Sequence, residues 1–95
     1  MTLHKTPKYE RSVKKIISSH ALTKEEIEET EELFKKDPLT PSLRYHKIAC
    51  KKDKYRHSIT VPNTQYRILL TVLEDNAYCV ALLNHKDYDR HNKHC

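Results

Sequence analysis

The amino-acid sequence predicts an α+β fold in which an N-terminal helical hairpin packs on one face of a curved, mainly antiparallel β-sheet. The chain has 95 residues, which allows a single domain over 1–95. Apolar residues recur with helical spacing over about 7–37 and alternate as in strands over about 43–84. The expected order of elements is therefore β-α-α-β-β-β(-β), followed by a His-rich tail over 85–95.

The first half of the chain carries signals for one short strand and two helices. Residues 2–5 are a candidate strand. Thr6 then offers an N-cap before a proline, and apolar side chains recur at helical spacing over about 7–19. Thr23 begins a capping-box pattern, which predicts the start of a second helix. This helix must end near Asp37, because the residue before a proline is disfavoured in helical conformation.

The second half carries the patterns of strands. Ser42–Ile48 is a candidate strand, and Tyr55–Val61 alternates between apolar and polar residues. Tyr66–Leu73 is apolar on both faces, as expected for a central strand. After a polar turn, Ala77–Leu83 returns as the partner strand of a hairpin.

The predicted central strand has two different faces. Ile68 and Leu70 point to one face, and Arg67 points to the other, because side chains alternate along a strand. We expect the helical hairpin to cover the apolar face. The face with Arg67 is then free to form a functional concavity, since an arginine within an apolar strand needs a partner.

The charge of the chain is unevenly placed. The formal net charge is +5, but residues 23–37 carry seven acids and three lysines, so that this segment is −4 and the rest is +9. One acidic helix beside a basic remainder suggests a surface for a polyanion. A well-solvated surface without such a partner is the alternative. The chain has no glycine, which excludes the glycine-dependent phosphate loops and dinucleotide fingerprints.

Composition also indicates a compartment. The sequence has no apolar run long enough for a transmembrane span, and its first residues do not resemble a signal peptide. Three cysteines without a secretory signal predict reduced thiols in the cytoplasm.

The residues of the predicted basic face fall into three chemical groups. The candidate phosphate ligands are Lys47, Lys51, Lys52, Lys54, Arg56 and Arg67. The candidates for proton transfer are His46, His57, His85 and Tyr88. The candidates for stacking on bases are Tyr45, Tyr55 and Tyr88. Together they are the parts that metal-free RNA cleavage needs: a base, an acid and a cation for the charged phosphorane.

Several of these residues have an ordinary structural alternative. His57 shares strand parity with Ile59 and Val61, so it is equally a packed core histidine. A single lysine in a charged loop is more often solvated than catalytic. The histidines of the tail and Cys95 are types that bind metals, but their spacing matches no standard zinc pattern. We therefore expect no metal and no cofactor.

The ordered motifs of nearly the whole chain resemble the RelE/ParE toxin superfamily of bacterial toxin–antitoxin systems. The segments that carry the resemblance are Thr6–Arg11, Lys14–Ile16, Asp37-Pro38, Ser42–Ile48, Tyr55–Val61, Tyr66–Leu69 and Asn84–Tyr88. No single segment is specific, whereas the ordered set is fairly specific. The sequence departs from the family pattern where Ala49-Cys50 and Asn84 replace glycines.

The resemblance implies a RelE-like fold and a ribosome-dependent mRNA endonuclease that works without metal. It implies that Arg67 stabilises the phosphate and that His85 and Tyr88 take part in acid–base chemistry and base stacking. His46 is catalytic in some members and structural in others. The catalytic residues expected on this basis are Arg67, His85, Tyr88, His46 and Lys54. The expected RNA-binding residues are Lys47, Lys51, Lys52, Arg56, His57 and Lys86.

The resemblance also implies partners and leaves alternatives. The expected partners are a cognate antitoxin, the ribosomal A site and its mRNA, with no membrane. One alternative is a gyrase inhibitor of the ParE branch, which has the same fold without the nuclease residues. Another is an RNA-binding module without catalysis, which would bind with a steep salt dependence and leave RNA intact.

Overall fold

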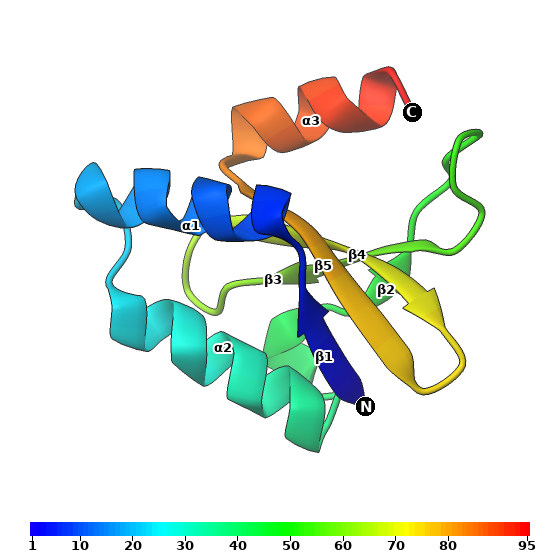
Figure 1. The fold of residues 1–95 in the computed structure, drawn as a ribbon, viewed down its shortest axis with the longest axis horizontal. Helices are drawn as coiled ribbons and strands as arrows, with labels where there is room; N and C mark the ends of the chain where they lie inside the picture. The colour runs from blue at the N-terminus through cyan, green and yellow to red at the C-terminus, as the bar shows by residue number, and fades with distance from the viewer.

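The computed structural model describes all residues from 1 to 95 and contains a five-stranded sheet with three α-helices (Figure 1). The elements in chain order are β1 (Thr2–Lys5), α1 (Pro7–Ser18), α2 (Lys24–Lys36), a 3₁₀ turn (Pro41–Leu43), β2 (His46–Lys47), β3 (Arg56–Thr60), β4 (Arg67–Leu73), β5 (Asn76–Leu83) and α3 (His85–Lys93). The order in the sheet is β1-β5-β4-β3-β2. Only the β1–β5 pair is parallel, so the predicted mainly antiparallel α+β fold is confirmed.

Local sequence signals define the helical hairpin. The Thr6 hydroxyl accepts a hydrogen bond from the Tyr9 N–H and caps α1. The same helix ends in a Schellman motif, in which His20 has a φ of 63° and donates to the Ile17 carbonyl. Both halves of the predicted capping box are present at Thr23, where α2 begins. Caps thus fix both helices at the predicted positions.

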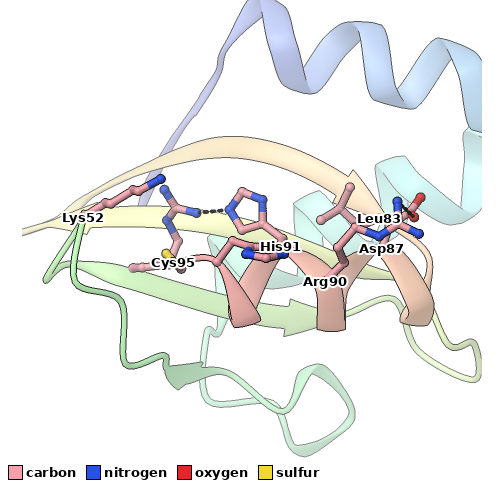
Figure 2. Close-up of a pocket in the computed structure, with 8 residues that line it drawn as sticks. Lys52, Leu83, Asp87, Arg90, His91 and Cys95 are labelled. Carbon is pink, nitrogen blue, oxygen red and sulfur yellow. Dashed lines mark hydrogen bonds and ion pairs between the residues drawn. The ribbon is translucent and has the colours of Figure 1, made fainter.

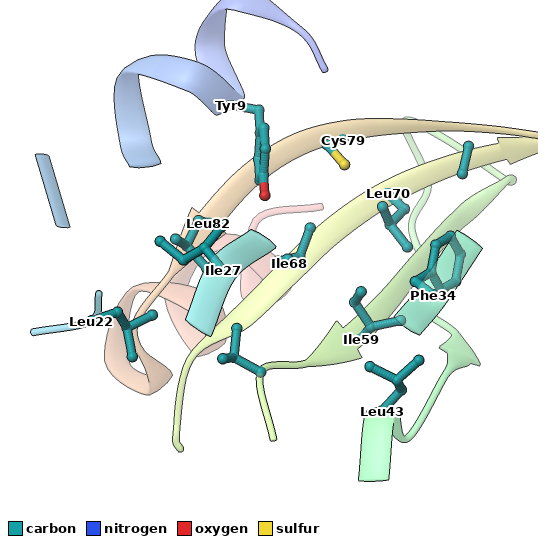
Figure 3. Close-up of a cluster of buried hydrophobic side chains, with 12 residues drawn as sticks. Tyr9, Leu22, Ile27, Phe34, Leu43, Ile59, Ile68, Leu70, Cys79 and Leu82 are labelled. Atoms are coloured by element: carbon teal, nitrogen blue, oxygen red, sulfur yellow. The ribbon is translucent and has the colours of Figure 1, made fainter. Parts of the chain in front are cut away.

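The core lies between the hairpin and the apolar face of the sheet (Figure 3). Its fully buried side chains include Tyr9, Ile27, Phe34, Ile59, Ile68, Leu70 and Leu82. The Tyr9 hydroxyl donates to the Glu31 carboxylate at 2.7 Å, and the Lys5 ammonium lies 3.1 Å from the other oxygen of that carboxylate. The buried acid is therefore both hydrogen-bonded and ion-paired, as burial of a charge requires.

Two predictions about the second half need correction. Ser42–Ile48 is not one strand, because a 3₁₀ turn occupies Pro41–Leu43, Arg44 is left-handed with a φ of 49°, and only His46–Lys47 pairs with β3. The polar tail contains a helix, α3, which the Asn84 side chain caps by accepting from the Asp87 N–H. This helix lies on the sheet face opposite the core, above the strands in Figure 1.

The expectation of three reduced thiols is also wrong for this structure. Cys50, in the β2–β3 connection, forms a disulfide with Cys95 at the end of the chain. Only Cys79 is free, and it is buried in β5. Burial raises the pKa of the Cys79 thiol to about 12, which makes it unreactive. None of the three helices is long and apolar enough to cross a membrane.

Candidate functional site

A chain of polar contacts crosses the sheet face beneath α3 and centres on Arg56. The Asp53 carboxylate accepts hydrogen bonds from the Tyr55 N–H at 2.9 Å and from the Thr71 hydroxyl at 2.5 Å. The same carboxylate lies 3.3 Å from Arg56 Nε. Burial opposes ionisation of Asp53, but these hydrogen bonds and the Arg56 charge outweigh it and lower the pKa of Asp53. On its other side, Arg56 Nη1 donates to His91 Nε2 at 2.9 Å (Figure 2).

The contact with Arg56 defines the protonation state of His91. A guanidinium can only donate, so His91 Nε2 accepts and the imidazole is neutral with its proton on Nδ1. Burial, and then the positive charges of Arg56, Lys8 and Lys52, lower the pKa of His91. The lone pair that could accept a proton is occupied by Arg56. His91 therefore orients the guanidinium, and it is not a free general base in this arrangement.

A groove of about 510 Å³ opens beside this pair. Its lining comes from β3, the end of β5, α3 and the β2–β3 connection, and consists of Lys52, Arg56, Leu83, Asp87, Arg90, His91, His94 and Cys95. Three of these side chains are cations, and the single acid, Asp87, lies 3.8 Å from the exposed Arg90 guanidinium. The groove is consequently electropositive and presents N–H donors, which suits a phosphate or another anion.

A second pair of predicted residues meets on the same face of the sheet. The Arg67 guanidinium lies over the Tyr88 ring, with Cζ 5.7 Å from the ring centroid. Arg67 is half-buried and forms no ion pair, and one of its N–H groups reaches the Tyr66 carbonyl at 3.4 Å. The predicted parity of the central strand is confirmed, because Ile68 and Leu70 lie in the core on the opposite face. Arg67 thus keeps most of its donors free.

The other predicted catalytic residues have different neighbours. His85 Nε2 lies 3.3 Å from Asp89, and its side chain is 55% exposed. On the edge strand β2, His46 Nδ1 is bonded to the Arg44 carbonyl. Lys54 lies over the Tyr55 ring at 5.5 Å. None of the predicted proton-transfer residues lines the groove, so the structure does not gather them around one phosphate position.

The predicted RNA-binding residues divide between the two sides of the sheet. Lys52 and Arg56 line the groove. His57 lies on the side of the helical hairpin, where it stacks on Tyr45 with ring centroids 5.2 Å apart. His57 is half-buried there and does not belong to the buried core, so it is not the packed core histidine that strand parity offered as the alternative. Lys47 lines a shallow depression of about 430 Å³ together with Lys54.

The remaining two lysines, Lys51 and Lys86, are exposed. Lys51 follows Cys50, and its N–H donates to the Cys95 carbonyl at 3.1 Å. Lys86 lies in the first turn of α3. Both are free to contact a polyanion near the groove.

Of the eight residues that line the groove, sequence reasoning predicted only Lys52 and Arg56 as site residues, and it missed the basic side chains Arg90, His91 and His94. Arg90 and His91 lie in α3 and His94 caps its end, in the tail for which the sequence patterns predicted no helix or strand. The missed signal was the i, i+3 spacing of Tyr88 and His91, which places both on one helical face.

Comparison with known structures gives the same fold. A copper-bound variant of a toxin from Helicobacter pylori matches with a TM-score of 0.71 and 16% identity, over 92% of this chain and 97% of that one. YafQ from E. coli matches with a TM-score of 0.71 and 9% identity, over 90% and 94%. A metal-bound H. pylori toxin gives 0.69 and 13%, over 92% and 97%.

The comparisons by sequence give no match: no protein-family model and no curated protein matches this chain. Although the H. pylori toxin structures carry metal, this chain has no group of three His, Cys, Asp or Glu side chains placed to bind a metal ion. At these identities the structural matches establish the fold. This chain therefore has the α+β fold of the H. pylori toxins and of YafQ, the RelE-like fold that its sequence motifs imply.

Proposed function

We propose that this chain is the toxin of a type II toxin–antitoxin system and cleaves mRNA in the ribosomal A site. The observation that carries the proposal is the electropositive groove in which Asp53 and His91 fix the Arg56 guanidinium. A guanidinium with two fixed partners is a preorganised phosphate ligand, because its remaining N–H groups point in a set direction. The fold shared with the H. pylori toxins and the ordered motifs support the same proposal.

The proposed reaction is a metal-free attack of the 2′-hydroxyl on the adjacent phosphorus. A base removes the 2′-hydroxyl proton, an acid protonates the departing 5′-oxygen, and cations stabilise the charged phosphorane. Arg67 and Arg56 are the proposed cations, and Tyr88 is the proposed base-stacking or acid–base residue beside Arg67. His46, His85 and Lys54 remain candidates for proton transfer. Their present partners are the exposed residues Asp89, Arg44 and Tyr55.

The proposed protein partner is a cognate antitoxin whose acidic residues cover the basic face. We expect the complex to protect Lys51, Lys52 and Lys54 from amine-labelling reagents. These lysines lie in or beside the connection that borders the groove. Equal labelling of the free toxin and of the complex would contradict this assignment. Action at the ribosome places the protein in the cytoplasm.

A second candidate function is RNA binding without cleavage. The specific observation in its favour is that His46 and His85 are bonded to other groups and lie outside the groove. Such a protein would bind RNA through the cations of the groove and leave the chain intact. Gyrase inhibition, the function of the ParE branch, is the remaining alternative within the same fold.

The test is a cleavage assay on ribosomes programmed with a defined mRNA, with the same RNA free in solution as the control. The nuclease proposal expects cleavage only when ribosomes are present. Intact mRNA together with salt-dependent binding would support the binding module instead. In a parallel assay, gyrase that loses its DNA-supercoiling activity when this protein is added would identify the ParE-like function and refute the nuclease.

A further inference from the structure

The disulfide joins the two walls of the electropositive groove. Cys50 belongs to the β2–β3 connection, which carries Lys52, and Cys95 follows α3, which carries His91. The two Cα atoms are 4.8 Å apart, and Cys95 itself lines the groove. The Lys51 N–H also donates to the Cys95 carbonyl at this point. One covalent bond therefore connects the part of the groove made by the sheet to the part made by the helix.

The helix α3 is held at the surface of the sheet rather than in the core. The helix has nine residues, and none of them is buried. Its polar contacts with the sheet include the hydrogen bond between His91 and Arg56 and the contact between Tyr88 and Arg67. A helix of this length is marginal on its own in water. Without the disulfide, its last turn is free to separate from the β2–β3 connection.

We propose that the Cys50–Cys95 disulfide is a reversible redox switch that assembles the groove when oxidised and opens it when reduced. Opening carries His91 and His94 away from Arg56 and Lys52, so the reduced protein binds and cleaves RNA less well. This inference rests on the proposed function. A protein that acts on ribosomes works in a reducing compartment, where disulfides are transient and regulatory.

The chemistry is thiol–disulfide exchange with a small-molecule disulfide of the glutathione type. One cysteine thiolate attacks a sulfur of that disulfide and releases one small thiol. The second cysteine thiolate then attacks the mixed disulfide, closes the Cys50–Cys95 bond and releases the second small thiol. The two cysteines lose two electrons and two protons, and the oxidant gains them.

The different exposure of the three cysteines makes the Cys50–Cys95 pairing selective. Cys50 and Cys95 are both partly exposed, so that small thiols reach them. Cys79, the remaining thiol, is only 1% exposed in the core and cannot compete for either partner. The chain thus contains one accessible pair and one inaccessible cysteine.

The test compares oxidised and reduced protein in glutathione buffers of stepped composition. Alkylation and mass spectrometry measure the thiols at Cys50 and Cys95, and cleavage on programmed ribosomes measures activity. We expect reduction to lower wild-type cleavage by about tenfold, because misplaced binding groups cost rates of this order or more. Cys95→Ser should show the reduced rate in every buffer, and Cys79→Ala is the matched control that keeps the wild-type response.

Amide hydrogen exchange provides a second measurement that does not depend on catalysis. Reduction, or Cys95→Ser, should speed exchange in residues 85–93 by about tenfold or more and leave α1 unchanged. If neither redox form cleaves mRNA, the proposed function fails while faster exchange still supports the switch. Equal exchange of α3 in both forms would overturn the switch, as would equal cleavage or the absence of a Cys50–Cys95 bond in the oxidised protein.

Discussion

Replacing Arg56 by glutamine removes the guanidinium that Asp53 and His91 fix at the groove. Its side chain is only 12% exposed, so it acts in a partly desolvated setting. A hydrogen bond to a charged group contributes about 1.5–3 kcal/mol, which corresponds to a loss of about 10- to 150-fold in affinity for RNA. Removing one phosphate contact should also reduce the slope of log affinity against log salt by about 0.7 for a single strand.

The assay for this prediction is fluorescence anisotropy with a labelled single-stranded RNA at several salt concentrations. Arg11→Gln is the matched control, because it removes the same charge from an exposed position in α1 outside the groove. Urea unfolding of both variants would show that each remains folded. If Arg56→Gln and Arg11→Gln lose affinity equally, with equal salt slopes, binding depends on net charge and the groove is not the RNA site.

Three further predictions concern stability and protonation. His20→Gly should raise the free energy of unfolding by about 0.5–1 kcal/mol, because glycine relieves the left-handed backbone at the end of α1; urea unfolding that shows no gain would contradict this. Tyr9→Phe should lower the free energy of unfolding by about 1.5–3 kcal/mol, because the buried Glu31 carboxylate loses a hydrogen-bond donor. An unchanged urea midpoint would refute that contribution. His91 should titrate below pH 6.5 by NMR, so its contribution to stability is present above pH 6.5 and lost as pH falls through its folded pKa. Arg56→Gln should raise that pKa, and an unchanged titration would show that the charge of Arg56 does not act on His91.

The two N-terminal helices were predictable because their signals are local. Thr6 and Thr23 cap them through hydrogen bonds to residues three positions away, which any reader of the sequence can anticipate. The break in the predicted strand Ser42–Ile48 was not predictable, because the left-handed conformation of Arg44 has no signal in a chain without glycine. A non-glycine residue adopts that conformation only where its surroundings require it.

Part of the candidate site was predictable because its signals, strand parity and charge pattern, are also local in the sequence. Strand parity places Arg67 on the face opposite the core, and the charge pattern selects Lys52 and Arg56. The contribution of His91 depends on α3 folding back across the sheet. That helix has no buried residue, and its position depends on contacts with distant segments, among them the disulfide. Such long-range contacts are not visible in a local pattern of residues.

The most direct test of the central claim is the rate of mRNA cleavage on programmed ribosomes by wild type, Arg67→Ala, Arg56→Gln and Arg11→Gln. We predict ribosome-dependent cleavage by wild type and Arg11→Gln at similar rates. Arg67→Ala and Arg56→Gln should each lose about 100-fold or more, because the proposed reaction uses these cations to stabilise the phosphorane. Intact mRNA with folded, oxidised wild-type protein, or undiminished cleavage by Arg67→Ala and Arg56→Gln, would contradict the account.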